Sequence, residues 1–151
     1  MKIPIDIHVR SERIGTEIIR RGSGENKPET DDFVVSGIMK NTKNGLQIEY
    51  SEENGAVITT INVFKDGMVS INRIGGINSH MVFESGKSFL CICNTGFFPM
   101  QIRVRTNSLE NTLSLDGGKL DIDYNVEIVG NLAEKNKLSF SVSPDISVLR
   151  S

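Results

Sequence analysis

Apolar and polar side chains alternate with a period of two along most of the chain, and this pattern limits the fold more than any other feature. Near the N-terminus the apolar members are Ile3, Ile5, Ile7 and Val9, and in segment 119–129 they are Leu120, Ile122, Tyr124, Val126 and Ile128. Successive side chains of a β-strand point to opposite faces, so such alternation is typical of strands with one buried face. The sequence has no clear amphipathic helical segment, and we therefore predict an all-β protein.

Turn signals separate the alternating segments. Asn44-Gly45, Asn54-Gly55, Asp66-Gly67 and Asp116-Gly117-Gly118 stand where two-residue or slightly longer hairpin loops belong. The expected strands are 3–10, 33–41, 46–52, 56–65, 68–74, 79–84, 88–94, 100–106, 109–115, 119–129 and 137–143. Successive hairpins favour an antiparallel up-and-down β-barrel over a sandwich, because closure leaves no exposed sheet edge.

The length of 151 residues fits one domain, so we expect residues 1–151 to form a single barrel. Two segments depart from the alternating pattern. Segment 22–32 is polar, contains glycine and lacks apolar residues, which predicts a flexible loop. Segment 144–151 is expected to be a tail.

The charge balance excludes some classes of protein. Lys and Arg number 17 and Asp and Glu 19, a net charge of −2, whereas nucleic-acid-binding proteins usually have a basic excess. Asp6 interrupts the first apolar positions, which argues against a signal peptide. No segment approaches the roughly 20 apolar residues of a transmembrane helix. We expect no nucleic-acid partner and no membrane association.

Two cysteines, Cys91 and Cys93, lie two positions apart on one expected strand. Their α-carbons are then roughly 6.5 Å apart along the strand, and a disulfide between them would be strained. Unpaired thiols without an export signal favour a cytoplasmic protein.

The hairpins at Asn54-Gly55 and Asp66-Gly67 fix which side chains share a face. They would place Tyr50 beside Ile58, and Thr60 beside Arg73. The face predicted to point inward is Leu46, Ile48, Tyr50, Glu52, Ala56, Ile58, Thr60, Asn62, Phe64, Val69, Ile71 and Arg73. The strand 56–65 remains ambiguous, because its other face carries Val57, Ile61 and Val63.

Arg73 and Glu52 are charged residues on this mainly apolar face. Buried charges are costly unless they are paired, so two interpretations are open: an internal pair, or a pair at a barrel mouth in contact with water. An inward arginine near hydroxyl groups would suit the anionic group of a ligand. The candidate ligand-binding residues are Arg73, Tyr50, Glu52, Thr60 and Tyr124.

The sequence lacks the patterns that carry catalysis or metal binding. It has no G-x-S-x-G nucleophile motif, and Cys91, Cys93, His8 and His80 do not have the spacing of a zinc site. Asp121 and Asp123 alternate with apolar residues and are expected on the solvent face. We therefore predict no enzymatic activity, no metal and no cofactor.

Several short motifs together resemble the YwiB-like family of small bacterial proteins. They occur in the same order over about residues 46–143: Tyr50-Ser51-Glu52, Thr59-Thr60, Arg73-Ile74-Gly75, Met81-Val82-Phe83 with Gly86, Thr95, Val104-Arg105-Thr106 and the segment 117–124. Cys93 replaces an aromatic residue usual in the family, and segment 22–32 resembles an insertion. The resemblance implies a calycin-like, or lipocalin-like, β-barrel and no established function.

Two functions remain in competition. The first is binding of a small, mostly apolar ligand with an anionic head inside the barrel. The alternative is a protein-interaction module with a filled barrel that acts through its outer surface or the Phe97-Phe98 turn, with a homodimer as one form of it. An enzyme ranks last.

Overall fold

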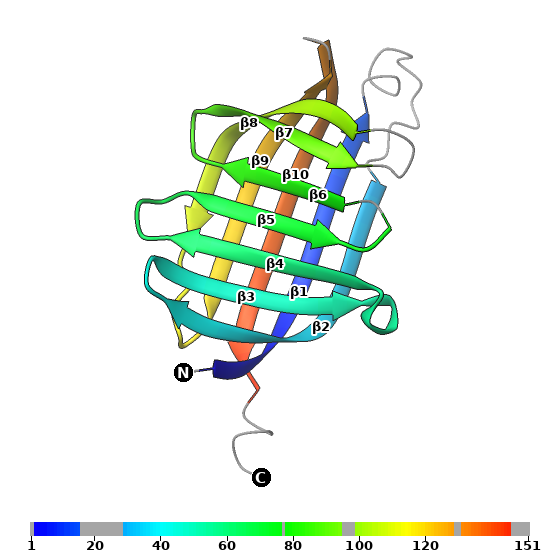
Figure 1. Cartoon of the computed structure of the whole chain (residues 1–151). Coiled ribbons are helices and arrows are strands. Elements are labelled where there is room, and N and C mark those ends of the chain that lie inside the picture. Colours follow the sequence, from blue (N-terminus) through cyan, green and yellow to red (C-terminus); the bar gives the residue numbers. More distant parts are fainter. Residues whose placement is uncertain (1, 16–28, 77, 95–98, 129–130, 146–151) are drawn as a thin grey trace.

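The computed structural model describes residues 2–15, 29–76, 78–94, 99–128 and 131–145 (Figure 1). The Phe97-Phe98 turn and most of segments 22–32 and 144–151 lie outside the described residues. Among the described residues, no helix is long and apolar enough to cross a membrane.

In these described residues, ten antiparallel strands form one closed barrel. They are β1 (Lys2–Gly15), β2 (Glu29–Thr42), β3 (Gly45–Glu52), β4 (Val57–Phe64), β5 (Val69–Ile74), β6 (Asn78–Phe83), β7 (Ser88–Asn94), β8 (Pro99–Asn111), β9 (Gly118–Ile128) and β10 (Asn131–Pro144). Each strand pairs with its neighbours in the sequence, and β1 pairs with β10 to close the ring. The predicted antiparallel up-and-down barrel is thus confirmed.

The barrel has two walls that cross one another (Figure 1). We call β3 to β7 the near wall, and β1, β8, β9 and β10 the far wall. β2 joins them, because it pairs with β1 over Glu29–Lys40 but with β3 only from Gly37 onward. Gly37 stands where this second pairing begins, and a Cβ there would lie 2.7 Å from the Glu49 carbonyl oxygen. A side chain at this position would push the two strands apart.

Inward-facing apolar side chains from both walls fill much of the interior. The largest fully buried ones are Phe83, Phe140, Ile5, Ile7, Met39, Ile48, Ile61, Leu120, Ile122, Val69 and Val104. A side chain with no accessible surface borders no space large enough for water, so this apolar region is packed in the way of an ordinary protein core.

Several predicted boundaries need correction. The strand expected at 3–10 continues to Gly15, and the strand expected at 137–143 begins at Asn131. The strands expected at 100–106 and 109–115 are one strand, β8, with a bulge between Thr106 and Ser108. The Asn107 amide donates hydrogen bonds to Asp123 (3.1 Å) and Asn125 (3.2 Å), which anchors the bulge to β9. Residues 29–32 belong to β2 rather than to the predicted loop, because they pair with β1 from Arg13 to Arg10.

The predicted orientation of β4 was wrong. Tyr50 lies opposite Thr59, and Thr59 lies opposite Arg73, so Thr59 points inward and Thr60 outward. Ile58 is accordingly 41% exposed. The inward positions predicted on β3 and β5 are confirmed, including Tyr50 and Ile71.

Turn length is the physical reason for this error. The β3–β4 connection is a short 3-10 turn, Glu53–Gly55, followed by Ala56. At Asp66-Gly67 the loop has three residues, because the Phe64 amide donates to the Met68 carbonyl and Gly67 has a positive φ of 97°. The expected pairings of Tyr50 with Ile58 and of Thr60 with Arg73 leave three residues in the first loop and two in the second, whereas the structure has four and three. Each loop is thus one residue longer than expected, and together they reverse the faces of β4 relative to its neighbours.

The observed register predicts unequal effects of substitutions at adjacent β4 positions. Ile61→Ala should lower the free energy of unfolding by about 2–5 kcal/mol, because it opens a cavity in the packed region. Thr60→Ala, on the outer face, should change it by about 0.5 kcal/mol or less. Urea unfolding of both variants measures the difference. Equal losses, or a larger loss at Thr60, would contradict the register.

Candidate functional site

One end of the barrel interior is polar, in contrast to the packed apolar region. At this end β1, β3 and β5 finish and β2, β4 and β10 begin. The ionisable residues that the register places on the inward side there are Arg13, Glu29, Asp31, Glu52, Arg73 and Glu134. We call this region the polar end.

Tyr50, Glu52, Thr59 and Arg73 form one cluster at the polar end, the Arg73 cluster. Tyr50, Thr59 and Arg73 lie directly opposite one another on three adjacent strands. Arg73 Nη2 is 3.6 Å from Glu52 Oε2, and the Arg73 side chain is 48% exposed. The pair therefore lies at a mouth in contact with water, the second of the two interpretations that the sequence left open.

The Tyr50 hydroxyl is held in its neutral form. Burial raises the pKa of Tyr50 above its usual value, the adjacent Thr59 hydroxyl lowers it, the Glu52 carboxylate raises it and Arg73 lowers it. Although Thr59 lies close to Tyr50, no hydrogen bond of acceptable geometry reaches its Oγ1 from the described residues.

A second polar group, the Tyr124 row, crosses five neighbouring strands. Its members lie opposite one another in the order Thr106, Tyr124, Asn136, Arg13 and Glu29. Thr106, Tyr124 and Asn136 are buried, and the Tyr124 ring packs edge-on against Phe83 at a centroid distance of 4.9 Å. Arg13 donates a hydrogen bond to Glu29, and Arg13 Nε lies 3.6 Å from Glu134 Oε2.

Tyr124 is a strongly perturbed acid. Burial raises the pKa of Tyr124 to about 12, with a further increase from the negative charge of Glu134 and a decrease from Arg13. At neutral pH its hydroxyl is protonated and can donate as well as accept a hydrogen bond. Its predicted inward position is confirmed, whereas a binding role stays a prediction.

Three buried polar atoms lack a hydrogen-bond partner among the described residues: Thr59 Oγ1, Thr106 Oγ1 and Asn136 Nδ2. Each such group costs about 1–3 kcal/mol. All three belong to the Arg73 cluster or the Tyr124 row. They are the clearest mark of a site in this interior.

Sequence reasoning placed Arg73, Tyr50, Glu52 and Tyr124 correctly at the interior, but Thr60 faces outward. It missed Thr59, Thr106 and Asn136. A polar residue at an inward position of an otherwise apolar stripe was an available signal for Thr106, which stands two positions after the buried Val104. Arg13 and Glu134 could not be joined without knowing that β1 pairs with β10.

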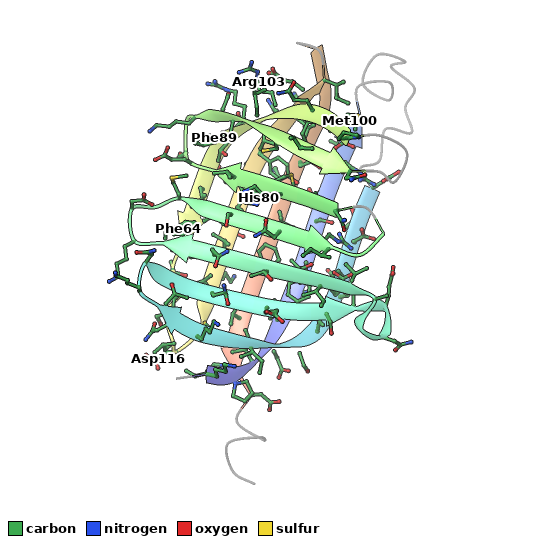
Figure 2. All side chains as sticks on the ribbon, in the orientation of Figure 1. Phe64, His80, Phe89, Met100, Arg103 and Asp116 are labelled. Carbon is green, nitrogen blue, oxygen red and sulfur yellow. The ribbon has the colours of Figure 1, made fainter. Side chains whose placement is uncertain are left out.

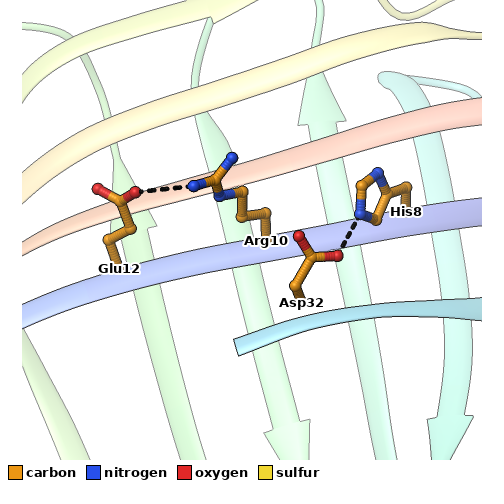
Figure 3. Close-up of polar contacts among 4 residues, drawn as sticks. All are labelled: His8, Arg10, Glu12 and Asp32. Carbon is orange, nitrogen blue, oxygen red and sulfur yellow. Dashed lines mark hydrogen bonds and ion pairs between the residues drawn. The ribbon is translucent and has the colours of Figure 1, made fainter. Parts of the chain in front are cut away.

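The outer surface carries charges and open hollows. One hollow, on the far wall, is lined by Arg10, Glu12, Ser108, Glu110, Asp121, Ile122, Asp123, Lys137, Leu138 and Ser139. Beside it, Arg10 donates to Glu12 (3.3 Å) and His8 contacts Asp32 (Figure 3). The lining of this hollow has four carboxylates against the cations of Arg10 and Lys137, but it contains none of the buried polar atoms that lack a partner.

The histidines and cysteines lie apart from one another in the barrel. His8 contacts Asp32 on the outside, His80 contacts Asn72, and Cys91 is buried. No group of three His, Cys, Asp or Glu side chains is placed to hold a metal ion in the described part of the chain.

Substitution of Arg73 tests the mouth position. Arg73→Met should lower the free energy of unfolding by less than about 1 kcal/mol, because a half-exposed ion pair contributes little. Thermal and urea unfolding would measure it. A loss of about 3 kcal/mol or more would instead indicate that Glu52 is left buried without a counter-charge.

The tyrosines can be titrated directly, since the chain has two tyrosines and no tryptophan. Tyrosinate absorbance should show Tyr124 ionising near pH 12, and Tyr124→Phe should remove that step. The pKa of Tyr124 is about 12 in the folded protein and 10 in the unfolded chain. The stabilisation that comes from keeping this hydroxyl neutral is therefore complete below pH 10 and is lost as the pH rises through 12. The loss should approach about 3 kcal/mol and should be reduced in Tyr124→Phe. Ionisation of both tyrosines near pH 10 would contradict the burial of Tyr124.

Comparison with known proteins agrees with the barrel and with the expected family. Residues 14–140 match the model of a family described as "Domain of unknown function (DUF1934)". The uncharacterized β-barrel protein YwiB of Bacillus subtilis is 24% identical over 127 residues, which cover 83% of this chain and 82% of YwiB. The crystal structure of YwiB superposes with a TM-score of 0.71 at 20% identity, covering 93% of this chain and 92% of that one. The chain belongs to the family that carries this domain of unknown function.

Proposed function

We propose that the polar end of the barrel binds a small molecule rich in hydrogen-bonding groups. The observation that carries the proposal is the set of three buried, unpartnered polar atoms of Thr59, Thr106 and Asn136. Their combined cost, about 3–9 kcal/mol, is comparable with the whole stability of a typical domain. A ligand that supplies their missing partners would recover much of this free energy.

Entry of the ligand requires movement at the mouth. The unpartnered atoms have almost no accessible surface, so neighbouring side chains must shift before a ligand can reach them. Arg73 and Arg13 are about half exposed, and Arg73 is held to Glu52 by a contact of 3.6 Å. Weak ion pairs of this kind separate at little cost. The Arg73–Glu52 pair is therefore the part of the mouth that we expect to open.

The charges and the packing refine the class of ligand. The polar end has four carboxylates, those of Glu29, Asp31, Glu52 and Glu134, against the guanidinium groups of Arg13 and Arg73. This excess of negative charge favours a neutral or positively charged polar ligand over an anionic head. The packed apolar region likewise favours a small polar ligand over one with a long apolar tail. The proposal differs in both respects from the expectation based on sequence.

Binding without catalysis is the proposed role, since the clusters contain no nucleophile paired with a base. Tyr124, with its raised pKa, is suited to donate a hydrogen bond rather than to transfer a proton near neutral pH. We place the protein in the cytoplasm, a proposal supported by the free thiols of Cys91 and Cys93.

Native mass spectrometry of protein purified from a bacterial host tests the proposal. We expect a non-covalent mass excess that disappears under denaturing conditions. Thr106→Val should lower the occupied fraction, whereas Thr60→Val, which alters the outer face of β4, should leave it unchanged. A spectrum at the mass of the chain alone, in all three proteins, would overturn the proposal.

Removal of the Thr106 hydroxyl should also change the stability of the ligand-free protein. In ligand-free protein, Thr106→Val should raise the free energy of unfolding by about 1–3 kcal/mol, because it replaces a buried, unpaired hydroxyl by a methyl group of similar shape. Thr60→Val again serves as the control, with a change of about 0.5 kcal/mol or less. A destabilised Thr106→Val variant would mean that the hydroxyl already has a partner in the empty protein.

A further inference from the structure

The two walls of the barrel present different outer surfaces. On the far wall the outward side chains are largely charged; they include Asp6, Arg10, Glu12, Arg103, Arg105, Lys119, Asp121, Asp123, Glu127, Lys135 and Lys137. On the near wall, β3 to β7, Glu49 is the one Asp, Glu, Lys or Arg among the outward positions of the described strands. Charged residues are depleted at the cores of protein interfaces.

Exposed aliphatic side chains also gather on the near wall. The large hydrophobic residues with substantial exposure in the described structure are Val34, Ile38, Ile58, Ile74, Leu90 and Ile92. Ile58, Ile74, Leu90 and Ile92 belong to the near wall, and the other two to β2. Ile74 and Ile92 are 63% and 61% exposed. Single exposed aliphatic residues are common, whereas a group on one uncharged face indicates an interaction surface.

Outward polar side chains of the near wall hydrogen-bond to one another. Gln47 donates to Asn62 (2.9 Å), Asn62 donates to Ser70 (3.3 Å), and His80 contacts Asn72. His80 lies near the middle of the wall (Figure 2). Polar groups that already have partners lose less free energy when water is removed from them. This wall can therefore be covered at a lower cost than the charged far wall.

We propose that the near wall binds a second copy of the chain in a symmetric homodimer. Ile58 and Ile74 lie directly opposite one another at the end of the wall where β4 begins and β5 finishes, whereas Leu90 and Ile92 lie on β7, the strand of the wall that pairs with β8. A two-fold axis passing between them, near Asn72 and His80, brings each aliphatic pair against the other pair of the partner. Such self-complementarity is what a two-fold interface requires.

The charge and the area of the near wall are consistent with binding of a second copy of the chain. Two nearly uncharged faces meet without the like-charge repulsion that two copies of a charged face would suffer. Five strands spaced about 4.8 Å apart, each with about seven residues at about 3.3 Å, give a face of roughly 550 Å². Two such faces bury roughly 1,100 Å², which exceeds the about 1,000 Å² needed for a specific interface.

Sedimentation velocity over a range of concentrations tests the dimer. The wild-type protein should sediment as twice the 16.7 kDa chain. Ile92→Glu places a charge within the interface and should weaken dimerisation at least about 30-fold, the effect of losing an interface hot spot. Val34→Glu is the control, because Val34 is an even more exposed aliphatic residue on β2, outside the near wall, and this variant should remain dimeric.

Three outcomes would overturn the proposal: a wild-type monomer at every concentration, an Ile92→Glu variant that dimerises as the wild type does, or loss of the dimer in Val34→Glu alone. Circular dichroism of each variant distinguishes loss of the dimer from loss of the fold. Because the near wall is an outer surface and the polar end is interior, this test is independent of the ligand proposal. Either can fail while the other stands.

Discussion

The pairing of the first strand with the last is the constraint on which the rest of this structure depends. β1 and β10 lie opposite one another from Ile5 and Pro144 to Gly15 and Glu134. Without this ladder the sheet would have two long unpaired edges, and nothing would hold it around a common interior. Closure also brings Arg13 beside Asn136 and Glu134, so the Tyr124 row reaches Arg13 and Glu29 only because the first and last strands pair.

The sequence predicts the features of the barrel that depend on local signals and misses those that depend on loop length and on contacts between distant strands. Alternation and turn dipeptides were sufficient for the strand order and for the inward positions of Tyr50 and Tyr124, because both signals are local. The face of β4 depended on turn length, and the β3–β4 turn holds Glu53 and Asn54 at positive φ, which glycine adopts more readily. The bulge at Asn107 similarly joined two expected strands into β8. Thr59 was therefore missed in favour of Thr60. Asn136 was missed because the expected last strand began one residue after it, whereas β10 begins at Asn131.

The interior combines two environments that make opposite contributions to stability. The packed apolar region supplies the hydrophobic driving force, as the full burial of Phe83, Phe140 and Ile48 indicates. The polar end opposes it, because Thr59 and Thr106 hold hydroxyl groups away from water without partners. A valine at either position would suit an interior selected for stability alone. Local departures from the most stable choice are expected where a protein binds something.

The outer surface, like the interior, has two distinct parts: a charged far wall and a nearly uncharged near wall. The far wall is charged, with pairs such as Arg10 and Glu12, and this surface keeps a small barrel hydrated. The near wall has few charged side chains and exposes Ile74 and Ile92. Such a surface favours association over solubility as a monomer. An interface on the near wall would cover the outer side of β3 to β5, while Tyr50 and Arg73 face the inner side of the same strands. One set of strands can thus bind a second copy through one face and a small molecule through the other, because alternate residues of a strand point to opposite sides.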